Sequence, residues 1–336
     1  MKKIETNERD FFDNVAKLIN DARGHLVKAV NSTMVITYYE IGRRIVEKEQ
    51  NGAERAEYGT QLIKGLSAYL TEKLGKGFSV RNLTNMRQFY QIYSKNQIRQ
   101  SAIAEFNPAI SWTHYLQLLR ITDLNERQFY EQEIVANDWT VKELQRQFDT
   151  ALYERLVLSR NKEKVLDLSK EGQIIESPAD IIKDPYVLEF LDLPEFASYS
   201  ESELEQGIID HLQEFMLELG KGFSFVARQE RFTFAEDSFY VDLVFYNRLL
   251  RGFVLIDLKI GKITPQDAGQ MQLYVNYYDR EIKLDDEHPT IGIVLCKEKN
   301  DSVVKMMLPE DNDQIFASKY ETLLPTKEQL LKLLDA

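Results

Sequence analysis

The first half of the chain repeats apolar residues every three or four positions, the spacing that places them on one face of a helix. The runs 11–30 and 35–49 both show this spacing, and each is predicted to be an amphipathic helix. Few segments alternate polar and apolar residues as half-buried strands do. We therefore predict an all-α domain over residues 1–160. Its predicted helices cover 11–30, 35–49, 58–74, a helix that begins at Ser79, 112–119, 126–136 and one that begins after Thr140.

The pattern changes twice in the second half of the chain. Residues 161–199 mix charged residues with prolines and are predicted to be a connector that packs on the second domain. An amphipathic helix is then predicted over 202–219, and a later one opens at Thr264-Pro265. Strand-like runs surround the second helix, so residues 200–336 are predicted to form a layered α/β domain. The predicted strands cover 223–227, 231–234, 239–246, 252–258, 290–296 and, at an edge, 314–320.

The composition fits two globular domains. The chain has 336 residues, 43% of them hydrophobic, and a single apolar core stops growing near about 250–300 residues. One cysteine, Cys296, excludes a disulfide framework and a thiolate metal cage. The histidines are scattered without the short spacing of a zinc site. The charged N-terminus and the lack of a long apolar run predict a cytoplasmic protein with no secretory signal and no membrane contact.

The net charge of −12 is unevenly distributed along the chain. Residues 1–160 hold 23 basic and 20 acidic side chains, whereas residues 161–336 hold 19 and 34. Within the first half, residues 61–100 contain seven basic side chains and one acidic side chain. Most charge runs are solvated helix faces, but this one is the main basic region of the chain. It is therefore the region expected to meet the phosphates of DNA.

The basic region has the order helix, glycine-rich turn, helix, which is the arrangement of a helix-turn-helix. On its second helix Val80, Leu83, Met86 and Tyr90 are predicted to face inward. Arginine, asparagine and glutamine make bidentate contacts with base edges. The candidate DNA-contacting residues here are Arg81, Asn82, Asn85, Arg87 and Gln88, and candidate phosphate contacts are Lys64, Lys73, Lys76, Arg87, Lys95 and Arg99. The alternative is an ordinary helical bundle that assembles an oligomer.

Three charged residues of the second half lie in or at the end of predicted strands, where burial of a charge costs free energy. Asp242 lies among the apolar residues of a predicted strand, and Asp257 and Lys259 end the next strand. Strand side chains alternate, so Asp257 and Lys259 point to the same side. Two carboxylates about 4 Å apart repel by roughly 4 kcal/mol at an effective dielectric near 20, and a divalent cation converts this repulsion into attraction. Carboxylate, carbonyl and water oxygens suit Mg²⁺ or Mn²⁺.

Residues on two predicted helices accompany this group. Glu205 lies on the helix upstream, and Gln270 and Tyr274 share one face of the following helix because they are four residues apart. By itself the Asp-X-Lys tripeptide is more often an ion pair at a strand end. The combined order favours a catalytic site, in which Lys259 helps to hold the attacking water or stabilises charge on the phosphate.

The segments Asp242, Asp257-Leu258-Lys259 and Gln270-Met271-Gln272-Leu273-Tyr274 resemble the PD-(D/E)XK nuclease superfamily with its Gln-XXX-Tyr extension. Nearly end to end, the chain is similar to the bacterial YhcG-like family, in which a helical domain precedes such a nuclease domain. The stretches that carry this likeness are Tyr39-Glu40-Ile41-Gly42-Arg43, Tyr58-Gly59, Gly77-Phe78-Ser79, Met86-Arg87-Gln88-Phe89-Tyr90, Ser111-Trp112-Thr113-His114-Tyr115, Asp257-Leu258-Lys259-Ile260-Gly261 and Gly269-Gln270-Met271.

The resemblance implies a restriction-endonuclease-like α/β fold for the second domain. It implies an endonuclease that hydrolyses DNA phosphodiester bonds with water activated by Mg²⁺ or Mn²⁺, in restriction, defence or DNA processing. The residues it implies are Asp242, Asp257, Leu258 and Glu205 for the metal, and Asp242, Asp257, Lys259, Glu205, Gln270 and Tyr274 for catalysis. The chain departs from the motif's name at Val241, where proline would stand, and its middle acid is Asp257 rather than glutamate.

Two other functions stay open from the sequence. A protein of this fold can lack catalysis and bind DNA as an accessory of a defence system. The helical half can instead be an oligomerising interaction module. For the nuclease we expect a homodimer, because two sites suit the cutting of both strands of a duplex. Partner proteins of a defence or DNA-processing system are also compatible with the sequence.

Overall fold

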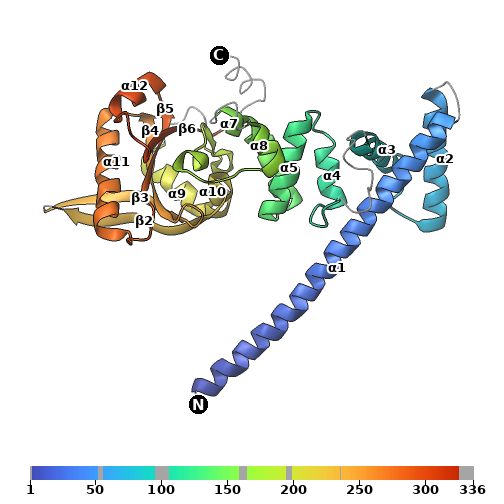
Figure 1. Cartoon of the computed structure of the whole chain (residues 1–336), viewed down its shortest axis with the longest axis horizontal. Helices are drawn as coiled ribbons and strands as arrows, with labels where there is room; N and C mark the ends of the chain where they lie inside the picture. The colour runs from blue at the N-terminus through green and yellow to red at the C-terminus, as the bar shows by residue number, and fades with distance from the viewer. Residues whose placement is uncertain are drawn as a thin grey trace. The chain divides into compact units, whose positions relative to one another are not determined.

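The computed structural model describes residues 2–51, 56–94, 106–158, 165–193, 199–234 and 236–324. Contacts within the chain divide it into two compact units, Met1–Leu144 and Gln145–Ala336. The first unit is helical, and the second is built on a six-stranded sheet (Figure 1). The predicted order of a helical domain and an α/β domain is confirmed, while the limits at 160 and 199 stay predictions. No described helix is long and apolar enough to cross a membrane.

The first unit begins with one long helix. We predicted two helices at 11–30 and 35–49, and this is wrong, because the helix α1 runs without a break. No glycine or proline separates the two runs, and the Thr33 hydroxyl donates to the Ala29 carbonyl 2.9 Å away. The described helices are α1 (Lys2–Asn51), α2 (Ala56–Leu74), α3 (Val80–Ser94), α4 (Trp112–Leu118), α5 (Leu124–Asn137) and α6 (Val141–Asp149), which begins in this unit.

Helix α3 packs closely on α1. A Cβ atom added at Gly42 of α1 would lie 2.0 Å from the carbonyl oxygen of Met86, so only glycine permits this approach. The predicted inward face is corrected at two positions. Val80 is 41% exposed because it is the first residue of α3, and Tyr90 is only half-buried. The buried residues of α3 are Leu83, Met86, Phe89 and Tyr93.

The second unit is a mixed sheet covered by helices. Its strands follow the order β1-β6-β5-β4-β3-β2. The β2, β3 and β4 strands are antiparallel neighbours, and β4, β5, β6 and β1 are parallel. The strands are β1 (Tyr186–Val187), β2 (Phe223–Phe234), β3 (Asp237–Asn247), β4 (Gly252–Lys262), β5 (Ile291–Glu298) and β6 (Ile315–Glu321). The helices are α7 (Leu152–Leu158), α8 (Val165–Glu171), α9 (Glu201–Asp210), α10 (Leu212–Leu219), α11 (Pro265–Tyr277) and α12 (Asp301–Met307).

Three predictions about the elements of this unit need correction. The strand β2 is continuous, although strands were predicted only at 223–227 and 231–234, because it pairs along its length with β3. The predicted helix 202–219 is divided into α9 and α10 at His211, whose backbone leaves the helical region at φ −118° and ψ 38°. Part of the predicted connector joins the sheet, since β1 pairs with β6.

Apolar side chains fill both faces of the sheet. Helices α9 and α10 cover one face and α11 covers the other (Figure 1). The first face includes Leu204, Ile208 and Phe215 with Phe245, Ile256 and Leu258. The second face includes Met271, Tyr274 and Val275 with Val241, Leu255 and Val294. Helices α9 and α11 therefore pack on opposite faces of the sheet that contains β4, the strand of Asp257 and Lys259.

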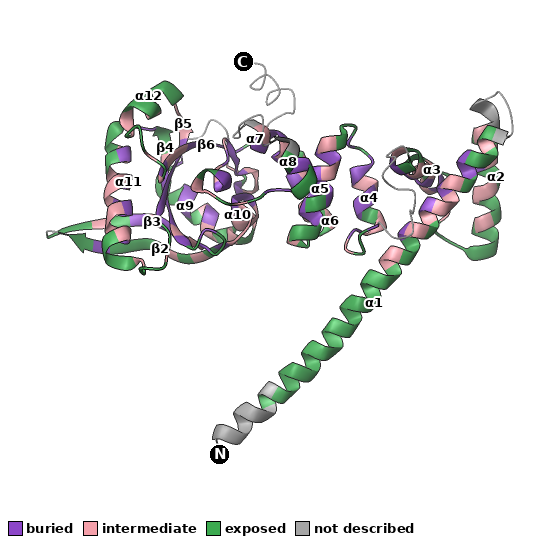
Figure 2. Ribbon diagram, viewed as in Figure 1, coloured by how far each residue is buried: buried purple, intermediate pink, exposed green. Residues whose placement is uncertain are grey.

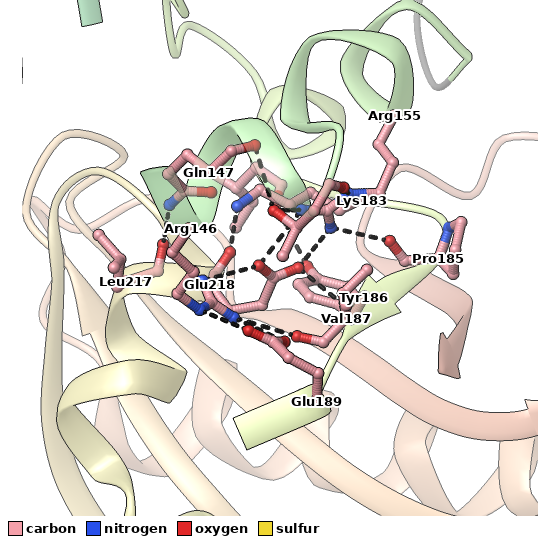
Figure 3. Close-up of polar contacts among 12 residues, drawn as sticks. Arg146, Gln147, Arg155, Lys183, Pro185, Tyr186, Val187, Glu189, Leu217 and Glu218 are labelled. Atoms are coloured by element: carbon pink, nitrogen blue, oxygen red, sulfur yellow. Dashed lines mark hydrogen bonds and ion pairs between the residues drawn. The ribbon is translucent and has the colours of Figure 1, made fainter. Parts of the chain in front are cut away.

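A buried charge cluster joins α6 and α7 to the sheet side of the second unit (Figure 3). The carboxylate of Glu218 and the guanidinium of Arg155 are both fully buried and form an ion pair. Arg146 lies 3.4 Å from Glu218, and the Lys183 ammonium donates to the Glu218 carbonyl. The backbone N–H of Val187 in β1 donates to Glu218 at 3.0 Å. The Glu218 carboxylate on α10 therefore links the consecutive helices α6 and α7 with the strand β1.

Candidate active site

The strand β4 carries a buried carboxylate and a lysine on the same side, within the strand rather than at its end, because β4 continues to Lys262. Asp257 is 3% exposed, and the Lys259 side chain is 17% exposed. The Lys259 Nζ atom lies 2.8 Å from Oδ2 of Asp257 and 3.8 Å from a carboxylate oxygen of Glu201 on α9. This contact is the one expected for two residues two positions apart on a strand. It places a cation directly beside the buried carboxylate.

Asp242 comes to the same place from the neighbouring strand β3. Its Oδ2 atom accepts a 2.8 Å hydrogen bond from the backbone N–H of Leu258. The expectation that Asp242 is the buried acid is wrong, since Asp242 is half-buried and Asp257 is buried. The strand changes face at this residue: Val241 lies in the core beside α11, and Leu243 lies in the core beside α9. The two apolar residues next to Asp242 in the sequence therefore lie on opposite faces of the sheet and do not bury its side chain.

The two carboxylates change each other's protonation. Burial and the nearby charge of Asp242 raise the pKa of Asp257 to about 7, although Lys259 acts in the opposite direction. Burial would lower the pKa of Lys259, but the carboxylates of Asp257, Glu201 and Asp242 raise it overall. The site thus holds a charged lysine next to a carboxylate whose negative charge is costly. A cation is the partner that would make that charge favourable.

Glu205 reaches this group from α9, which begins at the N-cap residue Ser200. Glu205 is 5% exposed and forms an ion pair with Arg228 of β2. The Gln229 amide nitrogen lies 2.6 Å from Glu205 and 2.9 Å from Asp242. Sequence reasoning missed both Arg228 and Gln229. The only available signal was the β2–β3 hairpin register, which places Gln229 opposite Asp242 and requires the position of the turn.

Gln270 and Tyr274 lie on α11, beside the same face of the sheet as Asp257. The Gln270 amide donates to the Tyr274 hydroxyl. Tyr274 is 1% exposed and packs edge-on against Phe232, and burial raises the pKa of its hydroxyl. Thr264 caps α11 and Pro265 starts it, which holds the helix at this position. The structure therefore brings the predicted pair together with the carboxylates of the site.

The oxygen atoms of this group suit a hard divalent cation. Asp242, Asp257 and Glu205 supply carboxylates, and the Leu258 carbonyl is the backbone group that the sequence assigned to the metal. In the described ranges no three His, Cys, Asp or Glu side chains converge as a metal cage, and the Gln229 amide lies between two of the carboxylates. Burial and the charge of Asp242 raise the pKa of Asp257 despite the neighbouring Lys259, so a further cation would favour its ionised form. The chemistry of the residues therefore fits Mg²⁺ or Mn²⁺.

The candidate DNA-contacting residues of α3 divide into two groups. The Asn82 side chain donates to the Gly77 carbonyl at 2.6 Å and accepts from the Trp112 indole at 3.0 Å. Arg87 forms a 2.9 Å ion pair with Glu49. These contacts give Asn82 and Arg87 roles in the fold of the first unit. Arg81 is exposed and Asn85 is half-buried, and the exposed Gln88 donates a long hydrogen bond to the Leu119 carbonyl at 3.4 Å. Lys95 and Arg99 lie outside the described residues.

Two family models match the chain in succession. The DUF1016 N-terminal domain covers residues 14–155, and the YhcG PDDEXK nuclease domain covers residues 179–335. The Escherichia coli (strain K12) protein named "Putative nuclease YhcG" is 40% identical over 343 aligned positions, which span 95% of this chain and 91% of that protein. The chain belongs to the YhcG family. The predicted resemblance is confirmed, and the YhcG nuclease domain contains every residue of the candidate site.

A solved structure adds a weaker likeness. The crystal structure of a repair endonuclease from Pyrococcus abyssi is 16% identical and aligns with 39% of this YhcG-family chain and 50% of the archaeal chain. The TM-score is 0.26, so this likeness does not bear on the fold. Membership of the YhcG family carries the assignment to a PD-(D/E)XK nuclease domain. A nucleic acid is the substrate class that this domain implies.

Proposed function

We propose that this YhcG-family chain is a Mg²⁺-dependent endonuclease that hydrolyses DNA phosphodiester bonds in restriction, defence or DNA processing. The observation that supports it most is the carboxylate of Asp257 in β4, buried beside Lys259 and close to Asp242. A simple ion pair does not account for the raised pKa of Asp257. Burial and the neighbouring charge of Asp242 raise it, and a bound divalent cation would offset that cost.

The residues of the site have distinct roles in this proposal. Asp242, Asp257 and the Leu258 carbonyl would hold Mg²⁺, and Glu205 would support it from α9. Mg²⁺ supplies Lewis acidity, which neutralises phosphate charge and makes water a better nucleophile. The Lys259 ammonium stabilises the negative charge that develops on the phosphate oxygens. Gln270, half-buried on α11, would donate a hydrogen bond to the phosphate, and the buried Tyr274 hydroxyl would hold the Gln270 amide in place.

Cleavage of a panel of linear, branched and single-stranded DNA tests this function. We expect cutting with Mg²⁺ or Mn²⁺ and none with EDTA. Lys259→Ala should lower the rate by about 100-fold or more, because it removes a preorganised charge beside the reacting phosphate. Lys262→Ala, which removes an exposed lysine from the same strand, should change the rate less than about threefold.

Two outcomes would contradict the proposed nuclease activity or the proposed role of Lys259. Folded protein that binds DNA equally with Mg²⁺ and EDTA and cuts no member of the panel would identify a non-catalytic DNA-binding protein. Equal activity of Lys259→Ala and Lys262→Ala would remove Lys259 from the mechanism. Running RNA of the same sequences beside the DNA separates the proposed substrate from the broader class of nucleic acids.

We infer that α3 contributes DNA contacts through Arg81, Asn85 and Gln88. Arg81 and Gln88 are exposed, and these side-chain types can bond base edges and phosphates. The intramolecular contacts of Asn82 and Arg87 favour a supporting role for those two residues. The acidic second half of the chain would then be offset by the basic region 61–100, and binding should weaken as salt rises.

We also propose that the protein is a homodimer joined through the first half of α1. This part of the helix is exposed (Figure 2). It also carries large apolar side chains. Phe12, Val15, Ile19 and Leu26 are 63%, 38%, 48% and 66% exposed. Together with Ala22 they follow the alternating spacing of three and four residues that pairs two helices in a coiled coil. A second copy of α1 is the partner that has the same spacing.

The variant Ile19→Glu with Leu26→Glu tests the dimer. Burying two carboxylates in the helix pair is unfavourable, so the dimer dissociation constant should rise at least about 100-fold. The control Asn14→Glu with Asn20→Glu adds the same charge outside the stripe and should leave the dimer intact. Sedimentation equilibrium measures both. A wild-type protein that sediments as a monomer at all concentrations would exclude this interface.

A further inference from the structure

Gln229 of β2 joins two carboxylates of the proposed metal site. Its amide nitrogen donates to Oε2 of Glu205 at 2.6 Å and to Oδ1 of Asp242 at 2.9 Å. Glu205 belongs to α9 and Asp242 to β3, so one side chain ties together two separate elements. A side-chain amide carries two hydrogens and can give one to each oxygen. It therefore supplies partial positive charge at the place where two negative groups approach each other.

The backbone of β2 is distorted at Gln229, the residue that carries this amide. Gln229 has a φ of +48°, a conformation that residues other than glycine seldom adopt. It faces Asp242 between the regular pairs Arg228↔Leu243 and Glu230↔Val241. Strain of this kind persists where the surrounding structure requires it, and it gathers at functional sites. Here the distortion coincides with the bridge between the carboxylates.

The remaining oxygens of the two carboxylates also accept hydrogen bonds from the protein. Arg228 donates to Oε1 of Glu205, and the Leu258 N–H donates to Oδ2 of Asp242. Each of these two donors reaches one carboxylate, whereas the Gln229 amide reaches both. Across the described part of the chain no three acidic, histidine or cysteine side chains form an open metal cage. The Gln229 amide occupies the space between Asp242, which would hold the cation, and Glu205, which would support it.

We propose that Gln229 is a placeholder for the divalent cation, holding Glu205 and Asp242 together until the metal displaces its amide. This inference rests on the proposed metal site. Gln229 is an exposed residue, so its side chain can rotate into the solvent when the metal displaces it. Its amide then forms hydrogen bonds with water instead. Removal of the amide should destabilise the metal-free site more than the occupied one. Metal affinity should therefore increase when Gln229 is replaced, which is the opposite of what a ligand or supporting residue would show.

Direct Mn²⁺ binding by calorimetry on the full chain tests the placeholder. Gln229→Gly removes the amide and accepts the positive φ, and it should bind Mn²⁺ at least about tenfold more tightly than wild type. The matched control is Arg251→Gly, which relieves a similar φ of +47° in the turn between β3 and β4. Its affinity should equal that of wild type, since the ion pair it loses is exposed.

A second variant tests whether the change in backbone flexibility, rather than the loss of the amide, alters the affinity for Mn²⁺. Gln229→Asn keeps an amide but is one methylene shorter and cannot span both carboxylates, so it should also bind Mn²⁺ more tightly. Unchanged or weaker binding by both variants would overturn the placeholder while leaving the metal site intact. Absence of Mn²⁺ binding by wild type would overturn the metal site and the placeholder together. The two failures are therefore distinguishable without measuring cleavage.

Discussion

Glu218→Gln should lower the free energy of unfolding of the second unit by about 3–5 kcal/mol. Glu218 and Arg155 are both fully buried, and Glu218 also accepts hydrogen bonds from Val187 N–H and from Arg155 Nη2 at 3.0 and 3.3 Å (Figure 3). A neutral amide leaves the Arg155 guanidinium buried without its counter-charge. Replacing Glu218 alone therefore destabilises the unit by more than the intact ion pair stabilises it, because the charge of Arg155 stays buried and unpaired.

The same carboxylate predicts a dependence on pH. Burial would raise the pKa of Glu218, but the charges of Arg155, Lys183 and Arg146 outweigh it and hold the pKa at about 2. Because this lies below the value near 4.3 of an unfolded glutamate, the ionised group stabilises the fold above about pH 4.3. That stabilisation is lost as pH falls from about 4.3 towards 2. The difference between wild type and Glu218→Gln should shrink over the same range.

Urea unfolding of wild type, Glu218→Gln and Glu214→Gln at several pH values measures this effect. Glu214 lies on the same helix, α10, outside the buried cluster, and its replacement should cost less than about 1 kcal/mol. A Glu218→Gln cost no larger than that of Glu214→Gln at pH 7 would show that the buried cluster does not stabilise the unit.

Asp257→Asn should raise the melting temperature of the metal-free protein while removing cleavage. The pKa of Asp257 is raised from 3.8 to about 7, so its ionisation opposes folding by at most about 4 kcal/mol at neutral pH. This penalty is absent below about pH 4 and complete above about pH 7. Asparagine keeps the shape without the charge, and a gain of several degrees is expected for a unit of this size.

Thermal unfolding in EDTA at pH 5 and pH 8 tests whether the gain in stability of Asp257→Asn comes from the ionisation of Asp257 or is independent of pH. The variant should exceed wild type clearly at pH 8 and less at pH 5. Asp237→Asn replaces an exposed acid on β3 and should change the melting temperature by no more than about 2 °C. A lower melting temperature for Asp257→Asn would mean that the ion pair with Lys259 outweighs the cost of burial.

Much of the candidate site could be predicted because its geometry is local. Asp257 and Lys259 are two apart on a strand, so the pleat alone brings them to one side. Gln270 and Tyr274 are four apart on a helix, and their side chains meet. The helix signals at Thr264 and Pro265 were correctly placed for the same reason, since capping depends on a few neighbouring residues.

Other parts of the site depend on contacts across the sheet. Gln229 meets Asp242 only through the register of a hairpin and a strained backbone, and an isolated glutamine in a strand signals neither. Asp257 rather than Asp242 is the buried acid because β3 changes face at Asp242. Strand periodicity assumes regular alternation, so it could not predict this irregularity.

The sequence by itself determined the helical first half, the α/β second half and the order of chemical groups along it. Only the tertiary structure decided that Glu218 meets Arg155 and Lys183, and that Gln229 stands between two acids. Secondary structure and motif spacing arise from neighbouring residues and are visible in a linear pattern. Burial, ion pairing and pKa arise from residues far apart in the chain, which only packing brings together.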